Sequence, residues 1–264
     1  MKFLCWNIDQ ARREEMHPET CWDSRSSKVK SLIERCNADI ISLIELRNLE
    51  TSKESARAFL SDPLFHKYDV VTRRYCHNKL CFHMALLYDP MRFFLGDVRL
   101  HSYLQEPDND KIVMFIDLQR KDDKSWFTIG VTHLDLPEEI KWASIHVLRQ
   151  LIAKQPYPCM VYGDYNFFDD RQGQEQREWM LKTCKDLANP LQSALGELKG
   201  TFIGFAHDEF KKSLEKPSRL DHIFSPNMVA KGCISPFLDE YKLDNNSYSS
   251  YTYPSDHLAL LLDI

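Results

Sequence analysis

The sequence predicts an α/β protein in which two β-sheets are covered by helices on their outer sides. Apolar runs of strand length recur along the whole chain, and amphipathic segments with the period of a helix separate several of them. The expected strands outnumber the expected helices, and several helices join consecutive strands, which favours two sheets with helices outside them. No linker rich in Pro, Gly or Ser interrupts the 264 residues, so we expect a single domain over residues 1–264.

The first half of the chain contributes strands and two helices. Residues 26–36 carry apolar side chains on one face of a helix. Residues 51–54 have the sequence of a capping box, which predicts a short helix that ends near Leu60. The strands expected from apolar runs cover residues 2–8, 39–46, 68–72 and 82–88.

The second half contributes two longer helices and the remaining strands. A helix is expected over residues 137–154, because Pro137 and the two acidic residues after it suit a first helical turn. Another helix is expected over residues 172–187. The expected strands cover residues 113–118, 126–132, 159–162, 220–224 and 258–264, and Phe202 belongs to the same late β region.

The composition limits the classes of function. The chain is 43% apolar and 12% aromatic, which is ample for a sizeable core. Its net charge of −5 argues against a general binder of long duplex DNA, whose affinity depends on a basic surface. A local basic patch is still compatible with a short, single-stranded or small phosphorylated substrate.

The cellular location is predicted from the absence of a membrane span and of a signal peptide, and from the pattern of cysteines. No stretch is long enough to span a membrane, and residues 1–6 lack the apolar core of a signal peptide. Eight cysteines are scattered without a CxxC pair, which favours reduced core thiols over disulfides or a zinc site. We therefore expect a cytoplasmic protein, with export by a non-classical route as the alternative.

The most informative motif is Gly163-Asp164-Tyr165-Asn166, which closes the apolar run of residues 159–162. Gly163 is expected to supply the backbone freedom that ends the strand. If the extended geometry persists, side chains alternate and Asp164 and Asn166 point the same way. A carboxylate beside a carboxamide can hold a water molecule, although the same residues also end strands simply by forming turns.

The same pattern recurs at five further strand ends. Glu45 lies in an otherwise apolar run, where a buried carboxylate is costly unless it is paired, and a metal ion is a good partner. Asp221 needs a partner for the same reason. The remaining candidates are Asn7, Asp9, His133, Asp135, Asp256 and His257. Asn7 and Asp9 are equally explained by the end of a strand, and Asp135 by a helix cap.

Together these side chains favour one chemistry. Acidic oxygen donors, amides and two imidazoles suit a hard cation and the metal-assisted attack of water on phosphorus. Zinc is disfavoured because the donors are mainly oxygens. A serine nucleophile is less supported because the chain has no G-x-S-x-G elbow, and a P-loop is absent too.

Six motifs, in this order, resemble the endonuclease/exonuclease/phosphatase (DNase I-like) superfamily over the whole chain. They are Trp6-Asn7-Ile8-Asp9, Leu43-Ile44-Glu45, Thr132-His133-Leu134-Asp135, Gly163-Asp164-Tyr165-Asn166, Arg219-Leu220-Asp221-His222-Ile223-Phe224 and Ser255-Asp256-His257. Two more resemble its bacterial branch, Trp22-Asp23-Ser24-Arg25 and Gly200-Thr201-Phe202-Ile203-Gly204-Phe205. The resemblance implies a four-layer αββα sandwich of two mixed β-sheets flanked by helices, with the site at one edge between the sheets.

The resemblance also implies a metal site. Glu45 would be the principal ligand of Mg²⁺, for which Mn²⁺ is expected to substitute. Asn7, Asp9 and Asp256 would help to hold one or two ions.

The resemblance assigns the remaining polar side chains to catalysis. Asp164 would orient or deprotonate the attacking water, and Asn166 would support the water and the phosphate. His257 would bind the phosphoryl oxygen, with Asp221 fixing its tautomer, and His133 would contact the phosphate from the other side. A positioned base, a charge clamp and an oriented imidazole are what phosphoryl transfer requires.

The sequence departs from the family pattern at three places. Ile44 stands where Gln is usual, and Tyr165 stands where Phe, Leu or Thr is usual. We expect Ile44 to face away from Glu45, so its effect should be on the surroundings of that carboxylate and not on activity itself. Residues 78–83 lack the expected Gly-rich stretch, which bears on substrate recognition.

The substrate is predicted less sharply than the chemistry. Basic residues near the motifs are candidates for binding extra phosphates or are equally a solvated surface; they are Arg12, Arg13, Arg47, Arg171 and those of segment 211–216. The leading hypothesis is a Mg²⁺-dependent nuclease or phosphodiesterase acting on short or single-stranded nucleic acid. The alternative is a phosphomonoesterase acting on inositol phosphates or phosphoinositides. A catalytically silent scaffold is a third reading, which the intact set of candidate residues argues against. The sequence does not predict the oligomeric state.

Overall fold

A computed structural model describes most of the chain. The described residues are 1–10, 21–47, 55–77, 80–103, 111–193, 196–198, 200–202, 218–236 and 254–264.

The described strands form one eight-stranded and one six-stranded sheet. The strands of the larger sheet are β1 (Lys2–Asn7), β2 (Ile40–Arg47), β3 (Asp69–His77), β4 (Leu80–Tyr88), β10 (Leu191–Ser193), β11 (Gly196–Leu198), β13 (Gly232–Ile234) and β14 (Leu260–Asp263). Their order is β11-β10-β13-β14-β1-β2-β4-β3.

The smaller sheet has the order β5-β6-β7-β8-β12-β9. Its strands are β5 (Phe93–Ser102), β6 (Ile112–Arg120), β7 (Trp126–His133), β8 (Cys159–Asp164), β9 (Lys185–Asp186) and β12 (Asp221–Ser225). The helices are α1 (Trp22–Cys36), α2 (Ala56–Leu60), a short 3-10 helix (Pro63–Phe65), α3 (Glu138–Ala153) and α4 (Arg171–Leu181).

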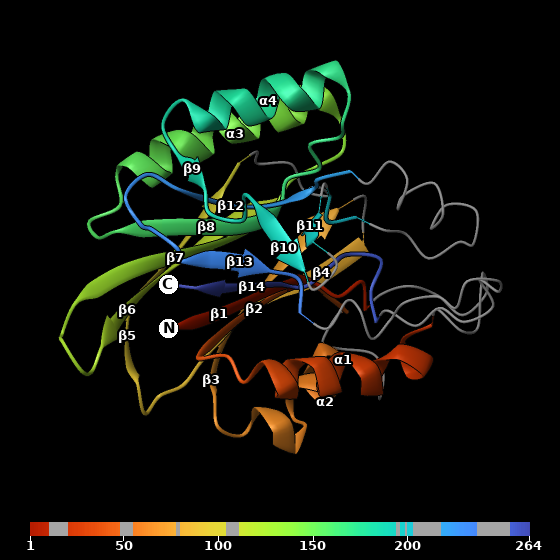
Figure 1. Cartoon of the computed structure of the whole chain (residues 1–264), viewed down its shortest axis with the longest axis vertical. Coiled ribbons are helices and arrows are strands. Elements are labelled where there is room, and N and C mark those ends of the chain that lie inside the picture. Colours follow the sequence, from red (N-terminus) through yellow and green to blue (C-terminus); the bar gives the residue numbers. More distant parts are fainter. Residues whose placement is uncertain are drawn as a thin grey trace.

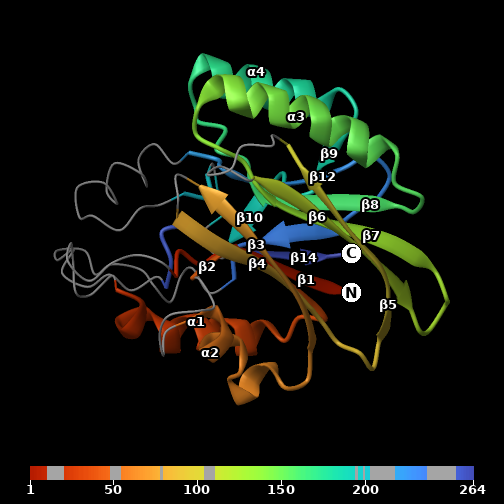
Figure 2. The ribbon, with the colours of Figure 1, turned by 180° about the vertical axis from the view of Figure 1, so that it is seen from behind.

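The elements stack in four layers, which confirms the predicted αββα sandwich. Helices α1 and α2 lie on one outer side and α3 and α4 on the other, with the two sheets between them (Figures 1 and 2). Each interface between layers is an apolar cluster. Phe3 and Ile44 belong to the cluster between the sheets, Val29 to the one under α1, and Ile145 to the one under α3.

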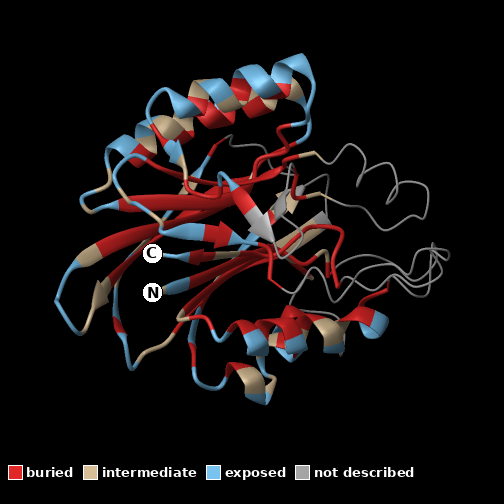
Figure 3. Cartoon of the chain, in the orientation of Figure 1, coloured by how far each residue is buried: buried red, intermediate tan, exposed pale blue. Residues whose placement is uncertain are grey.

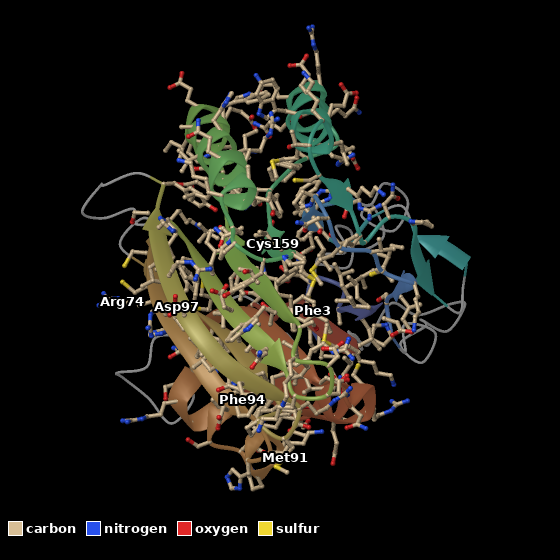
Figure 4. All side chains as sticks on the ribbon, turned by 90° about the vertical axis from the view of Figure 1, so that its left-hand side faces the viewer. Phe3, Arg74, Met91, Phe94, Asp97 and Cys159 are labelled. Atoms are coloured by element: carbon tan, nitrogen blue, oxygen red, sulfur yellow. The ribbon has the colours of Figure 1, made fainter. Side chains whose placement is uncertain are left out.

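Burial follows this layering. The inner strands are buried almost throughout, whereas the helices are buried only on the sides that face the sheets (Figure 3). Phe3 and Cys159 lie inside the molecule in Figure 4, while Met91, 81% exposed, lies at its periphery. The buried apolar surface stabilises the fold in proportion to the area removed from water.

The strand directions bring the ends of several strands to one edge of both sheets. Strand β1 is parallel to β2, and β7 is parallel to β8. Strand β12 runs antiparallel to β8, so that Asp221 pairs with Asp164. Strand β14 runs antiparallel to β1. The ends of β1, β2, β7 and β8 therefore meet the beginnings of β12 and β14.

The structure corrects several predicted boundaries. Helix α1 begins at Trp22, four residues before the predicted start, and α4 ends at Leu181 where 187 was predicted. The chain leaves α4 early because Lys185–Asp186 pairs with β12 at the edge of the sheet. The predicted capping box at 51–54 lies outside the described residues; helix α2 follows Ser55, whose hydroxyl accepts a hydrogen bond from Ala58 N at 3.3 Å.

Glycine is required at position 163 for a different reason from the one predicted. It lies within β8, and a Cβ placed on it would approach the carbonyl oxygen of Thr132 in β7 to 2.6 Å. Glycine is therefore required for the close approach of the two strands and not for ending one of them.

Two further findings concern location and thiols. Within the described residues, no helix is both long enough and apolar enough to cross a membrane. All eight cysteines are described, none of them forms a disulfide, and six of them are buried.

Candidate active site

The candidate residues gather where the strand ends of the two sheets meet. Strand β1 delivers Asn7, β2 delivers Glu45, β7 delivers His133 and β8 delivers Asp164. The Nδ2 atom of Asn7 donates to Glu45 Oε1 at 2.9 Å and to Asp164 Oδ2 at 3.2 Å. His133 Nε2 lies 3.7 Å from Glu45 Oε1 and 3.8 Å from Asp164 Oδ2. Residues from both sheets thus form one continuous polar cluster.

Glu45 reaches the cleft because β2 is irregular at this point. Its φ is 59°, and the pairing of β2 with β4 shifts register between Leu43 and Leu46. This bulge-like irregularity turns the carboxylate out of the apolar strand. Ile44 packs in the core between the sheets, while Glu45 lines the cleft.

His257 and Asp221 form a buried pair beside Asp164. Asp221 Oδ2 lies 2.7 Å from His257 Nδ1, and His257 Nε2 lies 3.6 Å from Asp164 Oδ2. Asp221 and His257 are 0% and 5% exposed. The Nδ1 contact fixes the ring so that Nε2 faces the cleft.

Hydrogen bonds from neighbouring segments hold this pair in place. The Thr201 hydroxyl accepts from the backbone N–H of Asp221 at 2.9 Å, and its carbonyl accepts from Leu258 N at 2.7 Å. Trp6 Nε1 donates to the carbonyl of His257 at 2.9 Å. The motifs around residues 6 and 201 therefore position the buried pair of Asp221 and His257.

Asn166 reaches the cleft through a turn and not through a continued strand. Strand β8 ends at Asp164, and the backbone N–H of Asn166 donates to Asp164 Oδ1 at 3.0 Å. The φ of Asn166 is 52°, a conformation that Asn tolerates better than most residues. Its Nδ2 atom donates to the carbonyl of Leu134 at 3.0 Å and lies 3.5 Å from His133 Nε2.

A buried lysine supports this turn from below. Lys141 of α3 is 0% exposed, and its Nζ donates to the carbonyl of Asn166 at 2.7 Å and lies 2.8 Å from Glu138 Oε1. A buried ammonium needs such partners to offset its desolvation. Helix α3 is thereby tied to the turn that carries Asn166.

Burial and neighbouring charges shift the pKa values of the cluster. Burial raises the pKa of Glu45 to about 8, and Asp9 and Asp256 add to the effect. Burial likewise raises the pKa of Asp164 to about 6, against the lowering effect of His257. Burial lowers the pKa of His257, but Asp221 and Asp164 outweigh it and raise that pKa well above its usual value. The site therefore places a histidine whose pKa is raised beside carboxyl groups that are buried close to one another.

The donor set fits a divalent cation. Ligand atoms of Glu45, His133 and Asp164 lie within 4.8 Å of one another, and so do those of Asp164, Asp221 and His257. The raised pKa of Glu45 reflects negative charge that is buried without full compensation, and a hard cation would compensate it. Asp9 and Asp256 raise the pKa of Glu45 through their charges. Together with Glu45 and Asp164, they bring four carboxyl groups to this end of the cleft.

The cleft above the cluster has largely apolar walls. Its volume is about 280 Å³. Polar groups form the floor, and the walls are made by Phe82, Leu134, Leu136, Phe168, Phe202 and Leu220. The Phe202 ring meets the His257 ring edge-on at 5.1 Å between centroids.

The sequence did not point to two residues of the site, Lys111, which lines the cleft, and Tyr75, which contacts His133. Lys111 lines the cleft and is 3% exposed, and its Nζ lies 5.2 Å from the centre of the Tyr75 ring. Burial lowers the pKa of Lys111 to about 8, against the raising effect of Asp135, Glu45 and Asp164. The sequence around Lys111 is polar and resembles a solvated loop, so no signal distinguished it.

Tyr75 was missed because it lies inside an ordinary strand pattern. Its hydroxyl lies 3.0 Å from His133 Nδ1 and accepts from the backbone N–H of Glu45 at 3.3 Å. The side chain is 1% exposed. Tyr75 therefore links the orientation of His133 to the irregular backbone of Glu45.

Only two of the arginines predicted to bind phosphate, Arg47 and Arg171, lie within the described residues. Arg12, Arg13 and segment 211–216 lie outside the described residues. Arg47 ends β2, and its backbone N–H donates to Gln10 Oε1 at 2.9 Å. Arg171 begins α4 with its side chain 91% exposed and paired with Glu175 at 2.9 Å. It does not line the described cleft, because the helix directs it to solvent.

Comparison with known proteins identifies the family. The profile of the Endonuclease/Exonuclease/phosphatase family matches residues 4–257. The chain belongs to this family. Family members are phosphoester hydrolases that generally use a divalent metal. No curated protein matches the chain significantly by sequence.

Solved structures share the fold across the whole chain. A mannosyl-6-phosphatase of Bacteroides thetaiotaomicron is 18% identical with a TM-score of 0.74, covering 100% of this chain and 98% of its own. D. rerio TDP2, complexed with a single-strand DNA product, is 14% identical with a TM-score of 0.69 and coverages of 99% and 97%. The human Nocturnin catalytic domain, with bound sulfate, is 18% identical with a TM-score of 0.65 and coverages of 99% and 92%. These similarities establish the fold, and the substrate must be inferred from the cleft.

Proposed function

We propose that the protein is a Mg²⁺-dependent phosphodiesterase that cleaves short or single-stranded nucleic acid by attack of water on phosphorus. The observation that carries this proposal is the arrangement of His257, Asp221 and Asp164. A buried imidazole, held by a carboxylate 2.7 Å from its Nδ1, presents Nε2 to a second carboxylate 3.6 Å away. This arrangement supplies a positively charged hydrogen-bond donor beside a candidate base.

The proposed roles follow from position. Asp164 orients and deprotonates the attacking water, and its raised pKa brings it closer to neutral pH, where a general base works best. Protonated His257 donates from Nε2 to a phosphoryl oxygen and stabilises the charge that develops there. Asn166 and His133 contact the phosphate or the water from the opposite side of the cleft.

Glu45, Asn7, Asp9 and Asp256 would hold the metal ion. Bound there, the ion would neutralise phosphate charge and act as a Lewis acid. In the structure Asn7 donates its amide to both Glu45 and Asp164, so it also keeps these two carboxylates at a fixed separation.

Lys111 and the aromatic walls support a nucleotide substrate. The buried ammonium lies at the cleft and can bind a non-bridging phosphate oxygen. Phe82, Phe168 and Phe202 offer faces or edges on which a nucleobase can stack, a contact worth about 1–3 kcal/mol per base. A polyhydroxylated ring gains little from such walls, which favours the nucleic-acid substrate.

The second candidate is a phosphomonoesterase acting on an inositol or sugar phosphate. The similarity to a mannosyl-6-phosphatase favours it, since the alignment spans 100% of this chain. A single phosphate with a sugar would fit a cleft of about 280 Å³.

One experiment separates the two candidates. Hydrolysis of a chromogenic phosphodiester and of the matching monoester is measured with Mg²⁺ and with chelator. We expect the diester to be cleaved only with Mg²⁺, and Glu45→Gln to raise the Mg²⁺ concentration needed for half-maximal rate. Glu139→Gln, a change in the first turn of α3, serves as control and should leave the metal response unchanged. Cleavage of the monoester alone would favour the phosphatase, and cleavage that ignores chelator would contradict both.

A further inference from the structure

Two cysteines face each other across the β3–β4 hairpin, next to the cleft. Cys76 and Cys81 are directly paired in the antiparallel register, and their Sγ atoms lie 2.7 Å apart. Both are half-buried, whereas the other six cysteines are buried. Residues paired in this way have Cβ atoms about 4.5–5.5 Å apart, and the lower end of this range meets the Cβ separation of about 3.5–4.5 Å that a disulfide spans.

Arg74 adds a charge to this pair. Its guanidinium donates to Cys81 Sγ at 2.7 Å. Arg74 lies at the outer edge of the molecule in Figure 4, so the thiol pair is close to solvent. A cation beside a sulfur favours the thiolate, which is the reactive form of cysteine. Burial raises the pKa of Cys76, followed by the effect of Cys81, so Cys76 remains the protonated partner.

The neighbouring residue pair points to the opposite face of the hairpin, on the side of the cleft. Tyr75 precedes Cys76, Phe82 follows Cys81, and these two residues pair across the strands with their rings stacked at 5.7 Å. Phe82 lines the cleft, and the Tyr75 hydroxyl contacts His133. Since side chains alternate along a strand, a bond between the cysteines would clamp the backbone that carries Phe82 of the cleft lining and Tyr75, which contacts His133.

We propose that Cys76 and Cys81 form a redox-active dithiol, which a hydroperoxide oxidises to a disulfide that clamps the hairpin carrying Phe82 of the cleft lining and Tyr75, which contacts His133. The inference is independent of the substrate proposed above.

The chemistry requires only the two thiols and the hydroperoxide. The Cys81 thiolate attacks one peroxide oxygen, the O–O bond breaks, and the departing hydroxide takes up a proton to become water. Cys76 sulfur then attacks the sulfenic acid sulfur of Cys81, and the S–O bond breaks. The hydroxide that leaves takes the Cys76 proton. Two thiols lose two electrons in total, and hydrogen peroxide is reduced to two waters.

The first test identifies the bond by mass spectrometry. The folded, reduced full chain is treated with hydrogen peroxide, unreacted thiols are alkylated, and the protein is digested without reductant. We expect a linked peptide joining Cys76 to Cys81, reversed by dithiothreitol, and none in Cys76→Ser or Cys81→Ser. Cys21→Ser is the matched control, because this thiol lies at the start of α1, and it should retain the link. A folded wild-type chain that shows free thiols or sulfinic acid at both positions would overturn the proposal.

The second test addresses the clamp. Hydrogen exchange is compared between the reduced and oxidised forms of the wild type. We expect slower exchange at the Tyr75 and Phe82 amides after oxidation and a melting temperature higher by about 4 °C, as for closure of a short loop. Exchange that is the same in both forms would show that the bond does not hold the cleft wall. Neither measurement depends on turnover, so failure here leaves the proposed activity untouched.

Discussion

The pair between Asp221 and His257 makes the sharpest prediction, through the variant Asp221→Asn. The substitution preserves the shape of the side chain and removes its charge. In the wild type, burial lowers the pKa of His257, and the carboxylates of Asp221 and Asp164 reverse this effect. Without the Asp221 charge the pKa of His257 must fall, so less imidazolium is present as the pH rises through neutrality.

The expected fall in kcat/KM follows from the contact between Asp221 and His257 that the substitution weakens. A hydrogen bond to a charged group contributes about 1.5–3 kcal/mol, and the contact here is 2.7 Å long between side chains that are 1% and 6% exposed. At about 1.4 kcal/mol for each factor of ten, kcat/KM should fall by about 10- to 150-fold at low pH. The deficit should widen as the pH rises through neutrality, because the variant loses the His257 proton at a lower pH than the wild type does.

A matched control exists in the same sheet. Asp186 Oδ2 lies 2.8 Å from His222 Nδ1, and this pair is also buried but does not line the cleft. Asp186→Asn should lower stability with little effect on kcat/KM. The assay is diester hydrolysis with saturating Mg²⁺ across the pH range, on protein whose folded fraction is checked by circular dichroism. Equal pH profiles for the two variants would refute the role assigned to the buried pair.

Three further predictions concern residues that support the cleft. Tyr75→Phe removes the hydroxyl beside His133 and should lower kcat/KM by up to about tenfold without unfolding the protein, measured by kinetics and thermal melting. Lys141→Met removes a fully buried ammonium with two partners; it should cost about 1–3 kcal/mol in urea unfolding, and an unchanged midpoint would contradict the support role. Gly163→Ala places a methyl group 2.6 Å from a β7 carbonyl and should destabilise by about 1–3 kcal/mol; wild-type stability would show that the strands can separate freely.

The fold was predictable because apolar runs dominate this chain. Strands such as β8, buried along its whole length, leave a clear signal in sequence. Strand β5 was missed because it forms the edge of its sheet and most of its side chains are at least partly exposed. The end of α4 was misplaced because the pairing of residues 185–186 with β12 is a long-range effect that helical periodicity does not contain.

The candidate site was predictable where a polar residue interrupts or closes an apolar run. Glu45, Asp164 and Asp221 stand out for that reason. The structure brings Glu45 and Asp164 to one cleft together with His133 and His257, and it places the buried Asp221 against His257. Tyr75 and Lys111 left no such signal, because a tyrosine suits any strand and a lysine suits any loop. Arg171 shows the converse error, since its nearness in sequence to a motif did not place it at the cleft.

The most direct test of the account is the effect of Asp164→Asn on Mg²⁺-dependent diester hydrolysis. Asp164 contacts Asn7 and lies beside both His133 and His257, and the proposed activation of water depends on it. We expect kcat to fall by about 10²- to 10⁴-fold with the fold retained. Turnover by the variant at the wild-type rate would contradict the assignment of this cleft as the hydrolytic centre.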